Sequence, residues 1–195
     1  GLVGLGKIGC HVAQVMKAAG MQVIAHDPFL PPDRARQLGV ELVGLDELLA
    51  RSDFVSLHTP LTEQTQGLFG AEQLQKMRQG ARLVNCARGG IVDEAALAES
   101  VSSGHLAAAG IDVYSTEPMT AGPLFEVRDL TLTPHLGAAT EEAEERCCLQ
   151  LAEQVVAFFR HGEIQNAVNV TGAADPSLAP FVAAARSMGR LAAAL

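Results

Sequence analysis

The sequence predicts an α/β protein in which a doubly wound parallel sheet carries helices on both faces. Three observations predict this class. A glycine-rich turn opens the chain, an acidic residue follows the next apolar run, and short apolar runs then alternate with helical patterns as far as Thr133. A long helix and a short helical tail are expected to follow the sheet.

Composition and charge narrow the function classes. The net charge of -8 and the absence of tryptophan argue against a nucleic-acid-binding surface. There is no signal peptide or long apolar span, and none of the four cysteines has metal-ligand spacing. We therefore expect a reducing, cytoplasmic location, no metal, and no nucleic-acid or membrane partner. Because the chain begins at Gly1 with a strand stub of two residues, it is expected to be a fragment.

The opening turn is Gly4-Leu5-Gly6-Lys7-Ile8-Gly9, which has the pattern G-x-G-x-x-G. It follows the apolar stub Leu2-Val3 and leads into a helical pattern that ends near Gly20. Glycines let the backbone turn tightly and approach a pyrophosphate, whose charge the helix N-terminus favours. A plain glycine turn is the alternative.

An acidic residue, Asp27, ends the next apolar run, which covers residues 22–26. A carboxylate here can accept hydrogen bonds from both ribose hydroxyls of a dinucleotide and repels a 2′-phosphate. Pro28 follows where an arginine would favour NADP, so NAD is the expected cofactor. The alternative is that Asp27 caps a turn. With the glycine turn, this residue predicts a Rossmann-type NAD-binding domain.

The remaining elements alternate along the chain. Helices are expected over residues 33–38, 46–50, 71–77 and 93–101, and strands over residues 40–43, 53–57, 81–84, 107–113 and 130–133. In such a sheet the ligand lies beyond the carboxyl ends of the strands. Polar residues follow these ends at Asp27, Thr59-Pro60, Arg88, Asp112 and His135. We expect them to converge on one crevice.

Three of the residues at or near this edge are candidates for catalysis. Arg88, in the loop Asn85–Gly90, can grip a small carboxylate through two parallel hydrogen bonds. His135 can take a proton from a substrate hydroxyl as hydride leaves for a nicotinamide. Glu117 can hold the second ring nitrogen of His135 and so fix its tautomer. The alternatives are a surface arginine, a structural histidine and a solvated loop acid.

Together these motifs resemble the nucleotide-binding domain of the D-isomer-specific 2-hydroxyacid dehydrogenases. The resemblance runs from Gly1 to about Val170 and rests on Gly4 to Gly9, Asp27, His58 to Leu61, Asn85 to Asp93, Asp112 with Glu117-Pro118, and Pro134 to Ala138. It implies that Arg88 binds the substrate carboxylate and that Glu117 pairs with His135, the acid/base. Formate dehydrogenases of this fold carry glutamine at the acid's position, so Glu117 favours the hydroxyacid branch.

The resemblance also implies NAD as the cofactor, a small 2-hydroxy acid as the substrate, and a homodimer formed through the nucleotide-binding domain. The expected cofactor contacts, including those of the glycine turn, are Gly4, Gly6, Lys7, Ile8, Gly9, Asp27, Thr59, Pro60, Cys86, Ala87, Arg88, Asp112, His135, Gly137 and Ala138.

Within this family, the chain most resembles the branch that oxidises D-3-phosphoglycerate to 3-phosphohydroxypyruvate, the first step of L-serine biosynthesis. The segment from Asn85 to Ala95 and the tail after Ala167 favour this enzyme over a co-repressor. The alternatives are a glyoxylate or hydroxypyruvate reductase and a non-enzymatic, NAD-sensing co-repressor. The family's substrate-binding domain is built mainly from residues before the glycine turn, so this chain is expected to lack most of it. We therefore expect the chain to bind NAD but to turn over little or no substrate.

Three regions are expected along the chain. Residues 1–139 form the NAD-binding domain, and residues 140–170 form a long interdomain helix with a short extended return. The helix is expected over Glu141–His161, because Thr140 is a suitable N-cap and Gly162 a suitable stop. Residues 171–195 are expected to be a linker and the helical start, over residues 181–195, of a further region.

Overall fold

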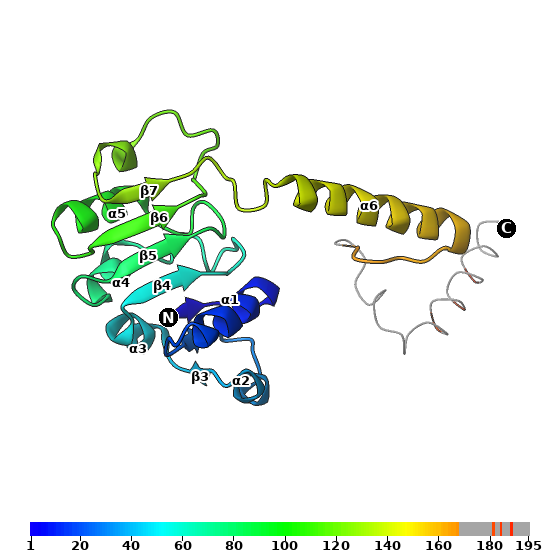
Figure 1. Cartoon of the computed structure of the whole chain (residues 1–195), viewed down its shortest axis with the longest axis horizontal. Coiled ribbons are helices and arrows are strands. Elements are labelled where there is room, and N and C mark those ends of the chain that lie inside the picture. The colour runs from blue at the N-terminus through cyan, green and yellow to red at the C-terminus, as the bar shows by residue number, and fades with distance from the viewer. Residues whose placement is uncertain (168–180, 182–183, 185–187, 189–195) are drawn as a thin grey trace. The chain divides into compact units, whose positions relative to one another are not determined.

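The computed structural model describes residues 1–167 together with residues 181, 184 and 188. The chain divides into two compact units, Gly1–Gly137 and Ala138–Leu195. The first unit contains the sheet and the second contains the long helix α6 (Figure 1). Among the described residues, no helix combines the length and the apolar character needed to span a membrane.

The first unit is built on one parallel sheet with the strand order β3-β2-β1-β4-β5-β6-β7. Its strands are β1 (Leu2–Val3), β2 (Ile24–His26), β3 (Glu41–Leu42), β4 (Phe54–Leu57), β5 (Arg82–Asn85), β6 (Ala108–Ile111) and β7 (Leu130–Leu132). The chain runs outward from β1 to β3, returns to β4 on the other side of β1, and continues to β7. This reversal is the switch point beside which ligands bind in open α/β sheets.

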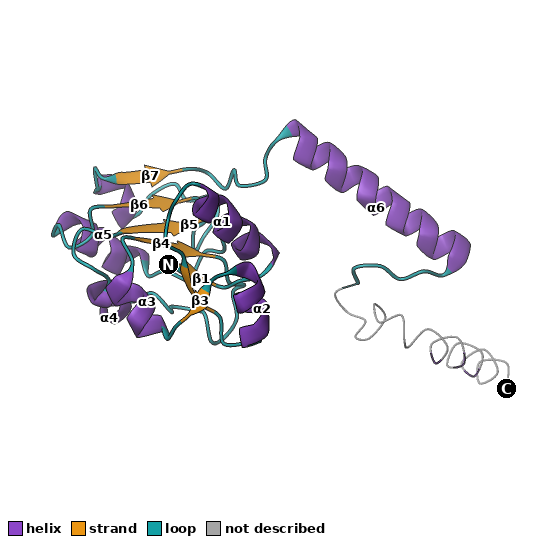
Figure 2. Ribbon diagram, turned by 60° about the horizontal axis from the view of Figure 1, so that its bottom comes forward, coloured by secondary structure: helices purple, strands orange, loops and turns teal. Residues whose placement is uncertain are grey.

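Helices cover both faces of the sheet (Figure 2). Helices α1 (Lys7–Ala18) and α2 (Pro32–Leu38) pack with β1 and β2 around a small core that includes Leu2, Ala13 and Val40. Helices α3 (Leu45–Arg51), α4 (Ala71–Lys76) and α5 (Glu94–Ser102), with the 3-10 turn η1 (Pro123–Glu126), enclose a larger core. The fold class predicted from the sequence is therefore confirmed.

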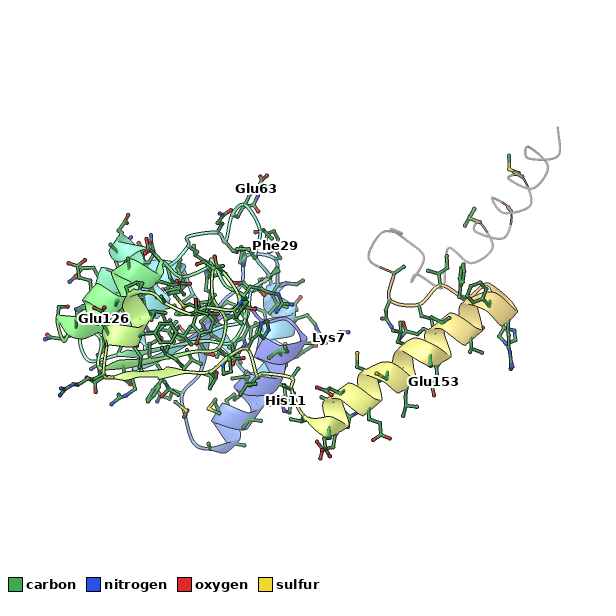
Figure 3. The ribbon with its side chains drawn as sticks, turned by 90° about the horizontal axis from the view of Figure 1, so that it is seen from above. Lys7, His11, Phe29, Glu63, Glu126 and Glu153 are labelled. Atoms are coloured by element: carbon green, nitrogen blue, oxygen red, sulfur yellow. The ribbon has the colours of Figure 1, made fainter. Side chains whose placement is uncertain are left out.

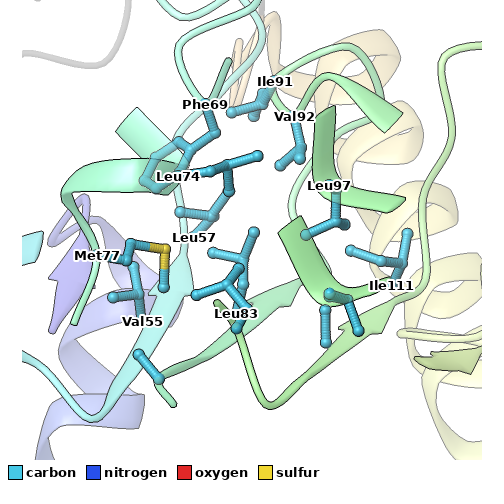
Figure 4. Close-up of a cluster of buried hydrophobic side chains, with 14 of the residues drawn as sticks. Val55, Leu57, Phe69, Leu74, Met77, Leu83, Ile91, Val92, Leu97 and Ile111 are labelled. Atoms are coloured by element: carbon cyan, nitrogen blue, oxygen red, sulfur yellow. The ribbon is translucent and has the colours of Figure 1, made fainter. Parts of the chain in front are cut away.

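The larger core is built from the sheet and the helices of one face. Figure 4 shows Val55, Leu57, Leu83 and Ile111 of β4, β5 and β6 meeting Leu74 of α4 and Leu97 of α5. All six side chains are fully or almost fully buried. Burying an aliphatic side chain of this size stabilises the fold by about 1.5 to 3 kcal/mol. This core supports the strands whose carboxyl ends carry the polar loops.

Several elements begin or end a few residues away from the prediction. The strand expected over residues 107–113 ends at Ile111, and the carboxylate of the next residue, Asp112, accepts the Leu136 amide of the loop after β7. The helix expected over residues 93–101 begins at Glu94, because Asp93 is its N-cap and accepts the amides of Ala95 and Ala96. The turn η1 was not predicted.

In the second unit, α6 spans Glu141–His161 as predicted. The Thr140 hydroxyl accepts the Ala143 amide at 3.2 Å, and Gly162 ends the helix with φ at +67°. The linker expected before residue 181 lies outside the described residues, as does all but the first part of the extended return. Of the helix expected over residues 181–195, the described residues Phe181, Ala184 and Met188 are helical.

Candidate active site

The register of the sheet brings the polar loops to one edge. One row of paired residues crosses six strands: His26, Val3, Leu57, Asn85, Ile111 and Leu132. Asp27, Thr59, Arg88, Asp112 and His135 follow this row by one to three residues. The sequence-predicted polar residues therefore lie along the same edge, although they are spread over more than a hundred positions.

The glycine turn leaves the N-terminus of α1 open. A Cβ on Gly4 would lie 2.8 Å from the His58 carbonyl oxygen, and a Cβ on Gly9 would lie 2.2 Å from that of Gly4. A Cβ on Gly6, by contrast, would meet nothing within 4 Å. Helix α1 has no side-chain cap and no acid in its first turn. Its free N–H groups and positive end therefore suit a pyrophosphate.

Asp27 holds the glycine turn to the end of β2. Its Oδ2 accepts the Leu5 amide at 2.8 Å, and its Oδ1 accepts the amides of Phe29 at 2.9 Å and Leu30 at 3.1 Å. Asp27 thus caps a turn, which was the alternative interpretation from the sequence. An ionised carboxylate has about four acceptor positions, so this role leaves room for a ribose hydroxyl.

The loop after β4 carries a buried hydroxyl without a partner. Thr59 Oγ1 is buried and has no hydrogen bond within the described part of the chain. Next to it, His58 Nε2 lies 3.0 Å from Ser56 Oγ, and burial lowers the pKa of His58. A polar atom of this kind normally has a protein, water or ligand partner. The unpartnered hydroxyl of Thr59 is therefore consistent with a loop that lines a cofactor site.

Arg88 stands on a loop that a buried asparagine holds in shape. Asn85 is 1% exposed, donates its Nδ2 to the Arg88 carbonyl oxygen at 3.1 Å, and accepts the Ala87 amide at 3.0 Å. The Arg88 side chain is exposed, donates to the Ala87 carbonyl oxygen at 2.6 Å, and forms no ion pair with a described residue. Partial burial and the Asp112 carboxylate raise the pKa of Cys86 on this loop. The guanidinium is available for a substrate carboxylate.

Glu117 and His135 form the pair expected from the sequence. Glu117 Oε2 lies 2.7 Å from His135 Nδ1, and Glu117 Oε1 accepts the Tyr114 amide at 3.0 Å. The hydrogen bond to His135, followed by that from Tyr114, lowers the pKa of Glu117. The His135 side chain is 49% exposed, so a ligand can reach the ring. With Nδ1 held by the carboxylate, Nε2 remains for proton transfer.

His135 sits in a turn that Asp112 fixes. The turn has φ at +61° at His135, a left-handed conformation that is uncommon for residues other than glycine. Asp112 accepts the Thr133 hydroxyl, the Leu136 amide at 2.7 Å and the Gly137 amide at 2.8 Å. Burial alone would raise the pKa of Asp112, but these donors outweigh it and the pKa is lowered. The buried carboxylate therefore orders the residues on both sides of His135.

Tyr114 connects the loops that carry the three candidates. The Tyr114 backbone amide donates a hydrogen bond to Glu117, and the Tyr114 hydroxyl donates to the Thr133 carbonyl oxygen at 2.9 Å. A Cβ on Gly89, the residue after Arg88, would lie 1.7 Å from the Tyr114 carbonyl oxygen. Sequence reasoning missed Tyr114 and the side chain of Asn85. A polar residue at the end of a buried strand was a signal for Asn85, whereas nothing in the sequence pointed to Tyr114.

Comparison with known proteins identifies the family. The family model described as "D-isomer specific 2-hydroxyacid dehydrogenase, NAD binding domain" matches residues 1–137. The chain belongs to the D-isomer specific 2-hydroxyacid dehydrogenases. The resemblance predicted from the sequence is confirmed, and residues 1–137 correspond to the NAD-binding domain of these dehydrogenases.

Similar members of the family include proteins named D-3-phosphoglycerate dehydrogenase. The Mycobacterium bovis protein is 49% identical over the whole chain, which covers 37% of that protein. The Synechocystis protein is 43% identical over 98% of the chain, which covers 35% of that protein. The chain thus spans a little over a third of the length of these curated relatives.

Solved structures of dehydrogenases have the same fold. A glyoxylate reductase from Paecilomyes thermophila matches with a TM-score of 0.79 and 36% identity, over 86% of this chain and 51% of that one. A D-isomer specific 2-hydroxyacid dehydrogenase from Lactobacillus delbrueckii, solved with NAD bound, matches with a TM-score of 0.78 and 31% identity, over 86% of this chain and 55% of that one. NAD is accordingly the cofactor of this domain type.

Proposed function

We propose that this chain is the cofactor-binding and catalytic half of an NAD-dependent dehydrogenase that oxidises D-3-phosphoglycerate to 3-phosphohydroxypyruvate, the first step of L-serine biosynthesis. The observation that carries the proposal is the 2.7 Å contact between Glu117 and His135 at the sheet edge that also holds Arg88. Relatives of 43 to 49% identity that are named for this reaction support the choice of substrate.

Each of the three residues has one task. Arg88 binds the substrate carboxylate through two parallel hydrogen bonds and so orients the hydroxyl-bearing carbon. His135 Nε2 takes the hydroxyl proton during oxidation and returns it in the reverse direction. Glu117 accepts the Nδ1 proton, which fixes the tautomer and balances the charge that His135 gains. NAD, when bound, supplies the hydride acceptor.

The cofactor is expected to follow the sheet edge. Gly4, Gly6, Lys7, Ile8 and Gly9 would hold the pyrophosphate, Asp27 the ribose, and Thr59 and Pro60 the adenosine end. Cys86, Ala87, Arg88, Asp112, His135, Gly137 and Ala138 would hold the nicotinamide end. Because three protein donors already occupy Asp112, its main contribution would be to hold the turn around His135.

The other interpretations have less support. The glyoxylate reductase structure is 36% identical, which is lower than the identity to the phosphoglycerate dehydrogenases. The curated relatives are named as dehydrogenases, which favours an enzyme over a co-repressor. We further propose a homodimer through the nucleotide-binding domain and, because the four cysteines are free thiols, a cytoplasmic location.

The test is an assay of NADH formation by a protein that joins this chain to the further segments found in its relatives. This joined protein is called the complete protein below. D-3-phosphoglycerate, D-glycerate and D-lactate would be compared as substrates. We expect activity with D-3-phosphoglycerate, a large loss of kcat/KM on Arg88→Lys, and little change on Arg34→Lys, an exposed arginine of α2. Activity with D-glycerate or D-lactate but not with D-3-phosphoglycerate would refute the substrate assignment. Absence of activity with all three hydroxy acids would refute the proposed dehydrogenase activity.

The chain alone gives a second test. We expect NAD to bind in calorimetry, with little or no oxidation of D-3-phosphoglycerate, because the chain spans only a little over a third of the length of the relatives named for this reaction. Steady-state activity close to that of the complete protein would contradict this expectation.

A further inference from the structure

Glu94 is a carboxylate near the candidate site that the proposed reaction does not use. It is the first residue of α5 and is half-buried. An acid in the first turn of a helix commonly serves the helix itself, by binding its free amides or by offsetting its dipole. Here Asp93 already caps α5, because its Oδ1 accepts the amides of Ala95 and Ala96, both at 3.0 Å. The Glu94 carboxylate is therefore available for contacts outside its own helix.

The Glu94 carboxylate accepts two hydrogen bonds from Ser115, in the loop after β6. Glu94 Oε1 lies 2.8 Å from the Ser115 amide and 2.8 Å from the Ser115 hydroxyl. The two residues are 21 positions apart, and Ser115 lies two residues before Glu117. A hydrogen bond to an ionised acceptor is roughly twice as strong as one between neutral groups. Glu94 thus ties the start of α5 to the loop that carries the proposed partner of His135.

The peptide group between Tyr114 and Ser115 makes two contacts with the segment that follows Arg88. A Cβ added to Gly89 would lie 1.7 Å from the Tyr114 carbonyl oxygen, so the two backbones pack closely. The amide of the same peptide group donates to Glu94. Packing on Gly89 prevents this peptide group from moving closer to the Arg88 loop, and the hydrogen bond to Glu94 limits its movement away. The two loops are therefore held at a fixed separation.

The position of this loop determines the position of Glu117. The Tyr114 amide donates to Glu117 Oε1 at 3.0 Å, and Glu117 Oε2 lies 2.7 Å from His135 Nδ1. The bond between Tyr114 and Glu117 lies within the loop, whereas Asp112 fixes the turn of His135 separately. A shift of the loop would therefore carry Glu117 along and change its distance from His135.

The loop has room to shift when the bond to Glu94 is absent. Glu94 lines a pocket together with three residues of the same loop, Thr116, Pro118 and Met119. Close packing of side chains is what normally resists small displacements in a protein. Because this pocket separates the loop from the start of α5, packing contributes little there. The hydrogen bonds of Glu94 are the link across this space.

The Glu94 contact lies away from the proposed pyrophosphate site. Turn η1 follows the Glu117 loop and packs with α5. In Figure 3, Glu126 of η1 and Lys7 at the N-terminus of α1 lie at opposite ends of the first unit. Loss of the Glu94 contact should thus affect catalysis without affecting the binding of NAD at the glycine turn.

We propose that Glu94 is a positioning residue that keeps Glu117 within hydrogen-bond distance of His135. This inference rests on the proposed function, because it concerns the geometry of the proposed catalytic pair. A displacement of about 1 Å between catalytic groups can cost about 100-fold in rate. The bond from the Tyr114 hydroxyl to Thr133 would still restrain the loop. We therefore expect Glu94→Ala to lower kcat of the complete protein by about 10-fold, with unchanged affinity for NAD.

Two further variants separate this role from a role in the stability of α5. Glu94→Gln loses the charge that favours the start of the helix, but its amide oxygen still accepts the hydrogen bonds of Ser115, so kcat should recover. Glu94→Asp keeps the charge but is one methylene shorter, so kcat should fall as in Glu94→Ala. The matched control is Glu99→Ala, which removes an exposed glutamate of the same helix.

A second measurement reports the catalytic pair directly and needs only the 195-residue chain. In the isotope-labelled chain, NMR of the ring nitrogens shows which nitrogen of His135 carries the proton. The contact with Glu117 favours a proton on Nδ1, because the hydrogen bond of one ring nitrogen sets the tautomer. Glu94→Ala should increase the fraction with the proton on Nε2, and Glu94→Gln should not. A change in helix stability alone would leave the tautomer of the folded chain unchanged.

The outcomes separate the two proposals. A lower kcat and a changed tautomer in Glu94→Ala and Glu94→Asp, with recovery in Glu94→Gln and no change in Glu99→Ala, support the inference. A wild-type kcat or a wild-type tautomer in Glu94→Ala and Glu94→Asp overturns the inference and leaves the proposed function intact. An equal loss of kcat in Glu99→Ala also overturns it. A complete wild-type protein without dehydrogenase activity overturns the proposed function, and the tautomer then decides whether Glu94 positions the pair.

Discussion

The contact between the Arg88 loop and Tyr114 leads to a prediction for Gly89→Ala. The added Cβ would lie 1.7 Å from the Tyr114 carbonyl oxygen, 2.1 Å from its carbonyl carbon and 2.9 Å from the Ser115 nitrogen. Ordinary van der Waals contact begins at 3.4 Å, so one of the two loops must move by about 1.7 Å. All three atoms belong to the backbone, and no side-chain rotation relieves the clash.

This movement should affect both stability and activity. Overpacking of this kind costs about 1 to 3 kcal/mol of unfolding free energy. A displacement of about 1 Å between catalytic groups can cost about 100-fold in rate. The loop that moves carries either Arg88 or the Tyr114 amide that holds Glu117. We therefore expect kcat/KM of the complete protein to fall by about 100-fold.

The assay combines urea unfolding of the chain with kinetics of the complete protein. Gly110→Ala in β6 is the control, because its Cβ would meet only the Val84 side chain, at 4.0 Å. We expect a change within about 0.5 kcal/mol for this variant. If Gly89→Ala had wild-type stability and kcat/KM, the loops after β5 and β6 would not be in contact, and the proposed geometry would be wrong.

Three further predictions concern the carboxylates of the site. Glu117→Gln should lower kcat by about 100-fold or more, because His135 loses the charge that holds its tautomer; stopped-flow kinetics showing less than a twofold change would contradict this. The pKa of Asp112 in the folded protein is below its usual value of about 3.9. Ionised Asp112 therefore contributes fully to the stability of the fold above about pH 3.9, and this contribution is lost as the pH falls through the folded pKa. Asp112→Asn should cost about 1 to 3 kcal/mol in urea unfolding at pH 7 and clearly less near pH 3, whereas a pH-independent difference would refute the assignment. Asp27→Asn should narrow the ratio of NAD to NADP affinity in calorimetry, because the charge that repels the 2′-phosphate is gone; an unchanged ratio would mean that Asp27 does not set the preference.

The sequence was sufficient to predict the fold class because its signals are local. The bounds of α6 were predicted correctly from Thr140 and Gly162, whose capping geometry depends on neighbouring residues alone. Strand ends were less accurate. The strand expected over residues 107–113 extends past the end of β6 at Ile111, because the next residues, Asp112, Val113 and Tyr114, are themselves buried. Apolar composition reports burial, and it does not distinguish a buried strand from a buried loop.

The location of the candidate site was also predictable, but most of its internal contacts were not. Parallel strands place their carboxyl ends at one edge, so Arg88 and His135 could be located from the alternation of elements. The groups that hold the loops of Arg88 and His135 in place could not be predicted, because those groups are distant in sequence from the residues they contact. The hydroxyl of Tyr114 meets the carbonyl of Thr133 across two loops. The oxygens of Asp112 are occupied by donors more than 20 residues away.

The carboxylates that hold backbone amides also provide a way to follow the site without substrate. The Tyr114 amide is bound by Glu117, and those of Leu136 and Gly137 by Asp112. Each proton is protected from exchange with solvent only while its carboxylate stays in place. In deuterated buffer, the exchange rates of these three amides would therefore report whether the carboxylates of Glu117 and Asp112 are in place in any variant, with or without the further segments found in the relatives.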